Sequence, residues 1–124
     1  MEEESVLEIT IPGTRNVEGK YTEYEVVCVT NNKSFKKRYT KVFKRYRDFY
    51  KLHSRLRCLV KVLPEFPRKR WNKMSGDVVE ERMRMLPIYM KFVCDQILSD
   101  REASGKIEAD IVDFIQGKDP ELDG

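Results

Sequence analysis

Three short basic segments contain the side chains best suited to binding an anion. Arg45-Tyr46 follows a strand-like stretch and precedes a helix-like one, Lys69 follows two prolines, and Arg82 lies in a long helical pattern. A guanidinium donates forked, charge-assisted hydrogen bonds to phosphate or to a vicinal diol, whereas a lysine ammonium suits a single phosphate. The free N–H groups at the start of a helix also favour an anion. The chemistry indicated is recognition of a phosphate.

The charges of the chain are unevenly distributed, although the net charge is only +3. Residues 33–73 contain 16 Lys and Arg against 2 Asp and Glu, with aromatic residues interleaved, and the segments on both sides are acidic. A positive block of this kind attracts a polyanion. Phosphoinositide membranes, RNA, DNA and acidic proteins all meet that description, so charge alone leaves the partner open.

A loop between the second and third basic segments places two large apolar residues in polar surroundings. Trp71 and Met74 lie within residues 70–76. Tryptophan is costly to leave in water and is suited to the membrane interface, which makes this loop a candidate for membrane contact. Its basic neighbours are Arg68, Arg70 and Lys73. The alternative is that Trp71 folds back onto the protein and that the charged side chains are only solvated.

The elements that position these residues begin with three predicted strands. Residues 5–11 alternate with a period of two until Pro12-Gly13, and residues 21–30 and 35–44 are rich in aromatic and β-branched side chains. The polar residues between the last two segments have turn composition, so these two strands should form a hairpin. We therefore expect a small antiparallel meander sheet with one apolar face that helices must cover.

From Arg47 onward the apolar period becomes three or four, which predicts helices. The first apolar stripe consists of Phe49, Leu52, Leu56 and Leu59. Residues 63–67, with two prolines, predict an extended crossing, and residues 77–98 and 107–116 predict a long helix that partly encloses Arg82 and a short last helix. The expected fold is α+β, with a three-stranded antiparallel meander sheet packed against three to four helices. The proline-rich crossing should lie between the first and second long helices.

Length and composition predict one soluble domain. The chain has 124 residues, of which 40% are apolar and 36% charged, enough for one core beneath a charged surface. We expect a single domain over residues 1–124, with a core over 4–117 and flexible tails at 1–3 and 118–124.

The sequence lacks the motifs of an enzyme, a metal site or a secreted protein. The single histidine, His53, has no Cys or acidic partner at ligand spacing, and no glycine-rich phosphate loop is present. The three cysteines fit neither a disulfide framework nor a zinc motif. No apolar run approaches the roughly 18 residues that span a bilayer, and the acidic start lacks signal-peptide features. We expect a cytosolic, non-enzymatic protein with no cofactor and no metal.

The basic segments resemble the motifs of phox-homology (PX) domains of the sorting-nexin type, which bind phosphoinositides. Residues 43–49 look like the family's Arg-Arg-Tyr-Ser-Asp-Phe signature, and residues 63–69 look like its proline-rich crossing followed by a basic residue. Residues 80–82 look like the arginine that opens its long helix. The three motifs occur in the family's order behind three predicted strands, and the resemblance covers nearly the whole chain.

The resemblance implies a role for each matched residue. Arg45 would hold the 3-phosphate of phosphatidylinositol 3-phosphate, and Tyr46 would pack against the inositol ring. Lys69 would meet the 1-phosphate, and Arg82 would bond to the 4- and 5-hydroxyls. The loop would enter the bilayer through Trp71 and Met74. Each residue also has a structural alternative, since Tyr46 could be ordinary core and Lys69 and Arg82 could lie in salt bridges.

Two positions depart from the family signature and add charge near the expected pocket. Lys44 stands where the family has its first arginine, and Arg47 stands where it has serine. The extra charge could admit a second phosphate. The residues expected to support the site electrostatically are Lys44, Arg47, Arg68, Arg70 and Lys73.

The resemblance implies a module that recognises phosphatidylinositol 3-phosphate and recruits its protein to endosomal membranes in trafficking and sorting. We expect a cytoplasmic protein, peripheral on early endosomal or vesicle membranes, with that lipid as its partner and protein partners left open. Another phosphoinositide, such as a bisphosphate, is one alternative. Nucleic-acid binding and a pure protein-interaction role are alternatives from other classes. Nucleic acid is disfavoured because the strands lack the exposed aromatic pattern of an RNA-binding sheet.

Overall fold

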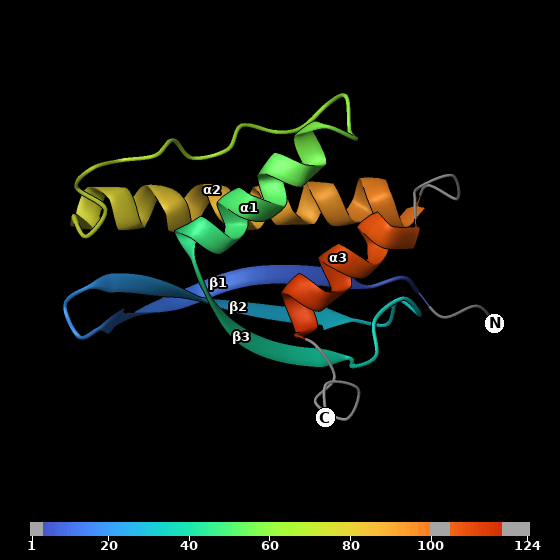
Figure 1. Cartoon of the computed structure of the whole chain (residues 1–124). Helices are drawn as coiled ribbons and strands as arrows, with labels where there is room; N and C mark the ends of the chain where they lie inside the picture. The colour runs from blue at the N-terminus through green and yellow to red at the C-terminus, as the bar shows by residue number, and fades with distance from the viewer. Residues whose placement is uncertain (1–3, 100–104, 118–124) are drawn as a thin grey trace, which may run out of the picture.

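The computed structural model of the chain describes residues 4–99 and 105–117. Within them, an antiparallel sheet in the order β1-β2-β3 carries three helices on one face (Figure 1). The strands are β1 (Leu7–Val17), β2 (Tyr21–Thr30) and β3 (Tyr39–Arg45), and the helices are α1 (Tyr46–Arg57), α2 (Gly76–Ser99) and α3 (Gly105–Gln116). The expected α+β meander is confirmed. The tails expected at 1–3 and 118–124 lie outside the described residues.

β1 is longer than its alternating pattern predicts. The predicted end at Pro12-Gly13 is wrong, because the strand continues to Val17. The pairing with β2 changes register between Thr10 and Gly13, and a bulge of this kind accommodates a proline that lacks the N–H for the ladder. The added residues carry the β1–β2 turn to the end of the molecule where the loop before α2 also lies (Figure 1).

β3 is shorter than predicted, because the residues before it bond elsewhere. Phe35, expected to begin the strand, is instead buried in the core from a loop. The backbone N–H groups of Lys36 and Lys37 donate to Oε1 of Gln116, at 3.0 and 3.2 Å. These amides therefore connect the loop to α3 rather than extend the sheet.

The first helix covers the sheet with most of its predicted stripe. Phe49, Leu52 and Leu56 are each buried in the core. The helix ends at Arg57, so Leu59 lies beyond it and is 61% exposed. The prediction that Leu59 belongs to the buried stripe is therefore wrong.

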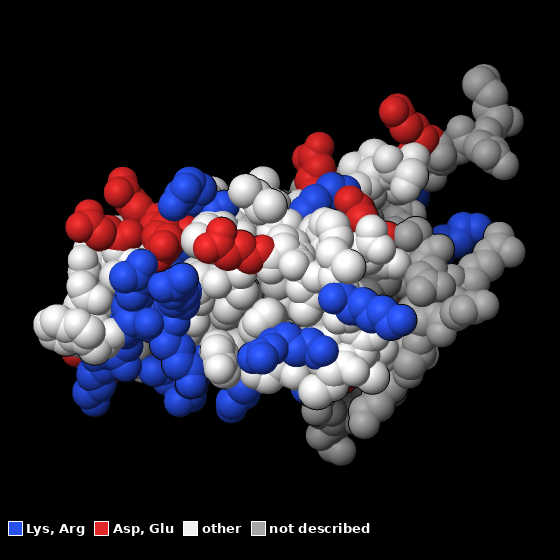
Figure 2. Space-filling view, turned by 90° about the horizontal axis from the view of Figure 1, so that it is seen from above, with Lys and Arg blue, Asp and Glu red and all other residues white. Residues whose placement is uncertain are grey.

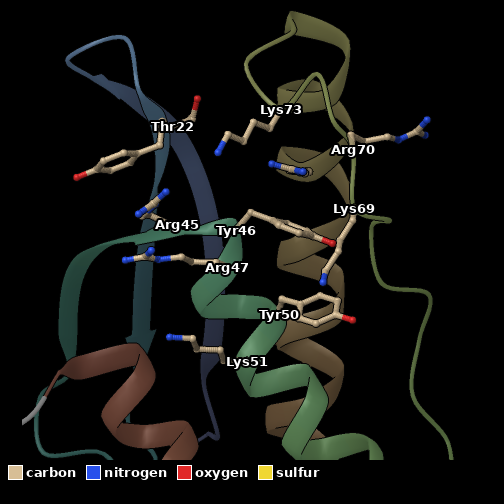
Figure 3. A pocket seen from close by; sticks show the side chains of 11 residues that line it. Thr22, Arg45, Tyr46, Arg47, Tyr50, Lys51, Lys69, Arg70 and Lys73 are labelled. Atoms are coloured by element: carbon tan, nitrogen blue, oxygen red, sulfur yellow. The ribbon is translucent and has the colours of Figure 1, made fainter.

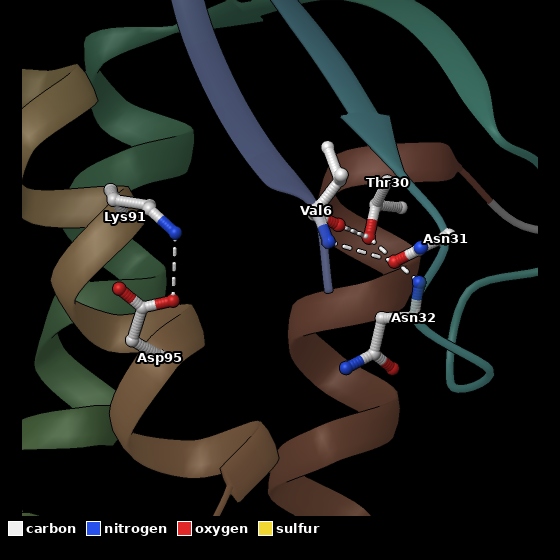
Figure 4. Close-up of polar contacts among 6 residues, drawn as sticks. All are labelled: Val6, Thr30, Asn31, Asn32, Lys91 and Asp95. Atoms are coloured by element: carbon white, nitrogen blue, oxygen red, sulfur yellow. Dashed lines mark hydrogen bonds and ion pairs between the residues drawn. The ribbon is translucent and has the colours of Figure 1, made fainter. Parts of the chain in front are cut away.

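α2 packs along β1 and contributes to both the core and the site. The helix continues through Pro87, whose ring removes one backbone donor without ending it. Leu86 and Met90 are fully buried, whereas Lys91 and Asp95 form an ion pair of 2.9 Å on the outer side of the helix (Figure 4). No helix in the part of the chain that the structure describes is long and apolar enough to cross a bilayer.

Side-chain hydrogen bonds fasten the sheet at the end away from the β1–β2 turn (Figure 4). The Val6 N–H donates to Oδ1 of Asn31, and the Thr30 hydroxyl donates to the Val6 carbonyl, both at 2.8 Å. The Asn32 N–H donates to Oγ1 of Thr30 at 3.0 Å. These bonds complete the pairing where β2 leaves the sheet.

Candidate functional site

A pocket of about 460 Å³ opens at the end of the molecule that contains the β1–β2 turn. Its lining residues are Tyr21, Thr22, Arg45, Tyr46, Arg47, Tyr50, Lys51, Lys69, Arg70, Lys73 and Arg82. Seven of these eleven residues are Lys or Arg and none is acidic. In the view from above, Lys and Arg side chains gather at this end of the molecule (Figure 2). The lining favours an anionic ligand.

Arg45 lies at the junction where β3 becomes α1. Its backbone N–H donates to Oδ2 of Asp48 at 2.9 Å, which fixes the first turn of the helix. Its guanidinium lies over the ring of Tyr21, with Cζ 3.8 Å from the ring centre. This cation–π contact orients the guanidinium, and within the described residues no carboxylate neutralises it.

Tyr46 and Arg82 form the buried side of the pocket. The Tyr46 hydroxyl donates to the Pro67 carbonyl at 2.6 Å, and Cζ of Arg82 lies 3.8 Å from the centre of the Tyr46 ring. Burial raises the pKa of Tyr46, and the Arg82 charge opposes that rise. The phenol therefore stays protonated and serves as a donor. Tyr46 therefore both packs against the hydrophobic core and lines the pocket.

Arg82 is 3% exposed, and its Nε–H has no hydrogen-bond partner among the described residues. Its charge also has no carboxylate partner there, so the predicted alternative of a salt bridge is not what the structure contains. A buried cation with an unused donor is costly unless a ligand accepts the hydrogen bond. Arg82 is therefore a buried cation in the pocket lining whose Nε–H is left unsatisfied by the described residues.

Lys69 approaches the pocket from the proline-rich crossing. Its Nζ lies 4.2 Å from the ring centre of Tyr50. The crossing is held by the His53 ring, which stacks on Phe66 at 4.3 Å between centres and whose Nδ1 lies 2.6 Å from the Tyr89 hydroxyl. Aromatic packing thus fixes a segment that has no regular secondary structure, and Lys69 with it.

The two apolar residues in the loop after Lys69 differ in their exposure to solvent. Trp71 is 95% exposed, whereas Met74 is half-buried and its sulfur accepts a hydrogen bond from the Thr22 hydroxyl at 3.5 Å. Arg70 pairs with Glu81 at 3.4 Å. The loop is therefore anchored to β2 and α2, and of its two apolar side chains only the indole is exposed to solvent.

The pocket brings together all four residues predicted to bind a headgroup. They are Arg45, Tyr46, Lys69 and Arg82. Three of the five predicted supporting residues also line it, namely Arg47, Arg70 and Lys73. The other two do not, because Lys44 places its Nζ 5.1 Å from the ring centre of Phe114 and Arg68 is exposed outside the lining.

Four lining residues were missed by the sequence reasoning. Tyr50 and Lys51 follow Tyr46 and Arg47 by one helical turn, a spacing that could have identified them. The other two, Tyr21 and Thr22, reach the site because the start of β2 pairs with the end of β3. No local signal indicates that pairing register.

Side chains point into the pocket from both sides of α1 (Figure 3). Arg45 and Arg47 extend to one side, whereas Tyr46 and Tyr50 extend toward Lys69 on the other. Such an arrangement can hold a ring with charged groups at opposite edges. Within residues 4–99 and 105–117, no group of three His, Cys, Asp or Glu side chains is placed to hold a metal ion.

Known proteins resemble this chain in sequence and in fold. The family model described as PX domain matches residues 32–103. Sorting nexin-3 of Aspergillus oryzae is 34% identical over 126 residues, covering 97% of this chain and 84% of that protein. Sorting nexin-3 of Saccharomyces cerevisiae is 36% identical over 95 residues, covering 67% of this chain and 57% of its own length. The chain thus spans little more than half of the latter relative.

The fold has a solved counterpart. An X-ray structure of a designed CISK-PX domain superposes with a TM-score of 0.66 at 24% identity, covering 88% of this chain and 98% of that one. The residues matched by the family model include those that bring cations into the pocket from β3, α1, the proline-rich crossing and α2. The chain belongs to the PX domain family.

Proposed function

We propose that the chain is a single PX domain that recognises phosphatidylinositol 3-phosphate and recruits the protein containing it to endosomal membranes. Membership of the PX family supports a non-enzymatic, phosphoinositide-binding role in membrane trafficking. The observation that carries the proposal is Arg82, buried at 3% exposure beside a pocket that has seven cations and no carboxylate in its lining. Such a site is poorly satisfied until an anion with hydroxyl groups enters it.

The pocket geometry supports a division of roles among the cations. Arg45, with its guanidinium over Tyr21, is suited to forked bonds with the 3-phosphate, and Lys69 on the other side of Tyr46 is suited to the 1-phosphate. Arg82 behind the Tyr46 ring is suited to the 4- and 5-hydroxyls. The ring itself would pack against the apolar face of the inositol.

Membrane attachment uses a different residue. Trp71 lies outside the pocket lining and is almost fully exposed, beside the cations of its loop. Its indole would enter the bilayer interface once the headgroup is bound. The protein would then be cytoplasmic and peripheral on early endosomal or vesicle membranes.

Liposome flotation tests this function. Vesicles of phosphatidylcholine, with and without phosphatidylinositol 3-phosphate, are mixed with wild-type protein, with Arg45→Ala and with Arg84→Ala, which removes an exposed cation outside the pocket lining. Wild type and Arg84→Ala should float only with the phosphorylated lipid, and Arg45→Ala should lose at least about thirtyfold in affinity. Excess RNA should not displace the protein. Equal binding by all three proteins, or displacement by RNA, would refute the proposal.

A further inference from the structure

Two buried polar groups behind the pocket have no hydrogen-bond partner among the described residues. They are the hydroxyl of Tyr24 and the Nε–H of Arg82. Tyr24 is fully buried on β2, two residues after the pocket-lining Thr22, and Arg82 is 3% exposed on α2. Almost all buried polar groups in native proteins are hydrogen-bonded, because leaving one unpaired is costly. Tyr24 and Arg82 therefore share an unsatisfied region beside the site.

The Tyr24 hydroxyl and the Arg82 guanidinium are neighbours. Burial raises the pKa of Tyr24, and the nearby Arg82 guanidinium opposes that rise. Among the described residues, Arg82 is the charged group that acts on this phenol. The geometry between them nevertheless falls short of a hydrogen bond. The phenol oxygen is thus an unused acceptor close to a guanidinium that has an unused donor.

The three nitrogens of Arg82 differ in their surroundings. Nε is enclosed by protein. The two terminal nitrogens form no hydrogen bond within the described residues and are not among the enclosed atoms, so they are accessible from the pocket that Arg82 lines. The ring of Tyr46 lies 3.8 Å from Cζ and supports the guanidinium. A cation–π contact sets the distance to the ring, but it does not determine which nitrogen points into the pocket.

We propose that Tyr24 is a positioning residue for Arg82, whose Nε–H donates to the Tyr24 hydroxyl oxygen when the headgroup is bound. The two terminal NH₂ groups then point into the pocket as a fork, which matches a vicinal pair of hydroxyls. This inference rests on the proposed function, because it takes the 4- and 5-hydroxyls to be the acceptors. Tyr24 lies outside the pocket lining and acts only through Arg82.

The test compares Tyr24→Phe with Thr40→Val. Each substitution deletes a buried hydroxyl that has no partner among the described residues, and Thr40 lies on β3 outside the pocket lining. Calorimetry measures binding of short-chain phosphatidylinositol 3-phosphate and of an analogue that lacks the 4- and 5-hydroxyls. Thermal unfolding of both variants is recorded beside wild type.

Both variants should keep the wild-type melting temperature or exceed it, because an unpaired buried hydroxyl stabilises nothing. Tyr24→Phe should bind the natural headgroup about tenfold or more weakly, whereas Thr40→Val should stay within about twofold of wild type. The analogue should bind equally to wild type and Tyr24→Phe, since it offers no hydroxyls for the fork. Undiminished binding by Tyr24→Phe, an equal loss in Thr40→Val, or an equal loss with the analogue would overturn the role of Tyr24.

NMR of the guanidinium provides a second measurement that a merely structural tyrosine would not affect. The Arg82 Nε–H resonance is assigned by its disappearance in Arg82→Lys. Bound headgroup should shift this resonance downfield and slow its exchange with water in wild type, but not in Tyr24→Phe at saturating ligand. The same shift in both proteins would overturn the proposed hydrogen bond. If wild type binds phosphatidylinositol 3-phosphate no better than phosphatidylinositol, the proposed function itself fails.

Discussion

Replacing Trp71 with serine should weaken membrane attachment without weakening recognition of the headgroup. The indole is 95% exposed, so the folded protein gains little from its contacts. Transfer of a large apolar side chain out of water is worth about 1.5–3 kcal/mol, which corresponds to roughly ten- to a hundredfold in affinity for a bilayer. Because Trp71 lies outside the pocket lining, that energy is available only when a bilayer receives the side chain.

Met74 should behave differently, although the sequence groups it with Trp71. Its half-buried sulfur accepts a hydrogen bond from Thr22. Replacing Met74 with serine should therefore lower the free energy of unfolding and loosen the loop, rather than remove an inserting group. Thermal unfolding of the two single variants distinguishes these roles, because Trp71→Ser should melt as wild type does.

Two binding assays separate attachment from recognition. Flotation with vesicles containing phosphatidylinositol 3-phosphate should show the loss for Trp71→Ser, and its residual binding should be more sensitive to salt. Calorimetry with a short-chain soluble form of the lipid should remain within about twofold of wild type, because no bilayer is present. Ile88→Ser, which removes an exposed apolar residue on α2, is the control and should be unaffected in both assays. Equal losses of Trp71→Ser in both assays would place the indole in the pocket and refute the reasoning.

Three further changes test how the pocket is held together. Tyr46→Phe removes the donor to the buried Pro67 carbonyl, and it should lower the free energy of unfolding by about 1–3 kcal/mol in urea denaturation. Arg82→Met should keep or raise stability, because the buried charge has no carboxylate partner among the described residues, yet reduce headgroup affinity by at least about thirtyfold in calorimetry. Burial lowers the pKa of His53 below 6.5, so the unfolded chain takes up the proton first. The free energy of unfolding should therefore decline as the pH falls below 6.5, and His53→Gln should flatten that decline.

The sequence predicts those parts of the fold where local periodicity agrees with the final packing. The bounds of β2 and the buried residues Phe49, Leu52 and Leu56 follow directly from their patterns. The end of β1 does not follow from its pattern. A bulge in the pairing with β2 accommodates Pro12, so the partner strand determines where β1 ends. The start of β3 is likewise not predictable from local sequence. The backbone N–H groups of Lys36 and Lys37, which could have extended the strand, instead donate to Gln116, which is distant in sequence.

The site residues that belong to short sequence motifs are predictable. Those that reach the pocket only through strand pairing in the sheet are not. The motifs identify Arg45, Lys69 and Arg82, which come from three segments and meet in one pocket. Tyr21 joins them only through the pairing of β2 with β3, so no local pattern reveals its contact with Arg45. Lys44 is adjacent to Arg45 in sequence but does not line the pocket. Successive side chains of a strand point to opposite faces of the sheet, and that of Lys44 lies over Phe114.

In the proposed function, the pocket recognises the 3-phosphate through Arg45. Isothermal titration calorimetry with short-chain phosphatidylinositol 3-phosphate, compared with unphosphorylated phosphatidylinositol, tests it most directly because no membrane contributes. Wild-type protein should bind the phosphorylated lipid and not the unphosphorylated one, and Arg45→Ala should lose at least about thirtyfold in affinity while keeping the wild-type melting temperature. Undiminished binding by a folded Arg45→Ala protein, or equal affinity of wild type for both lipids, would contradict the account.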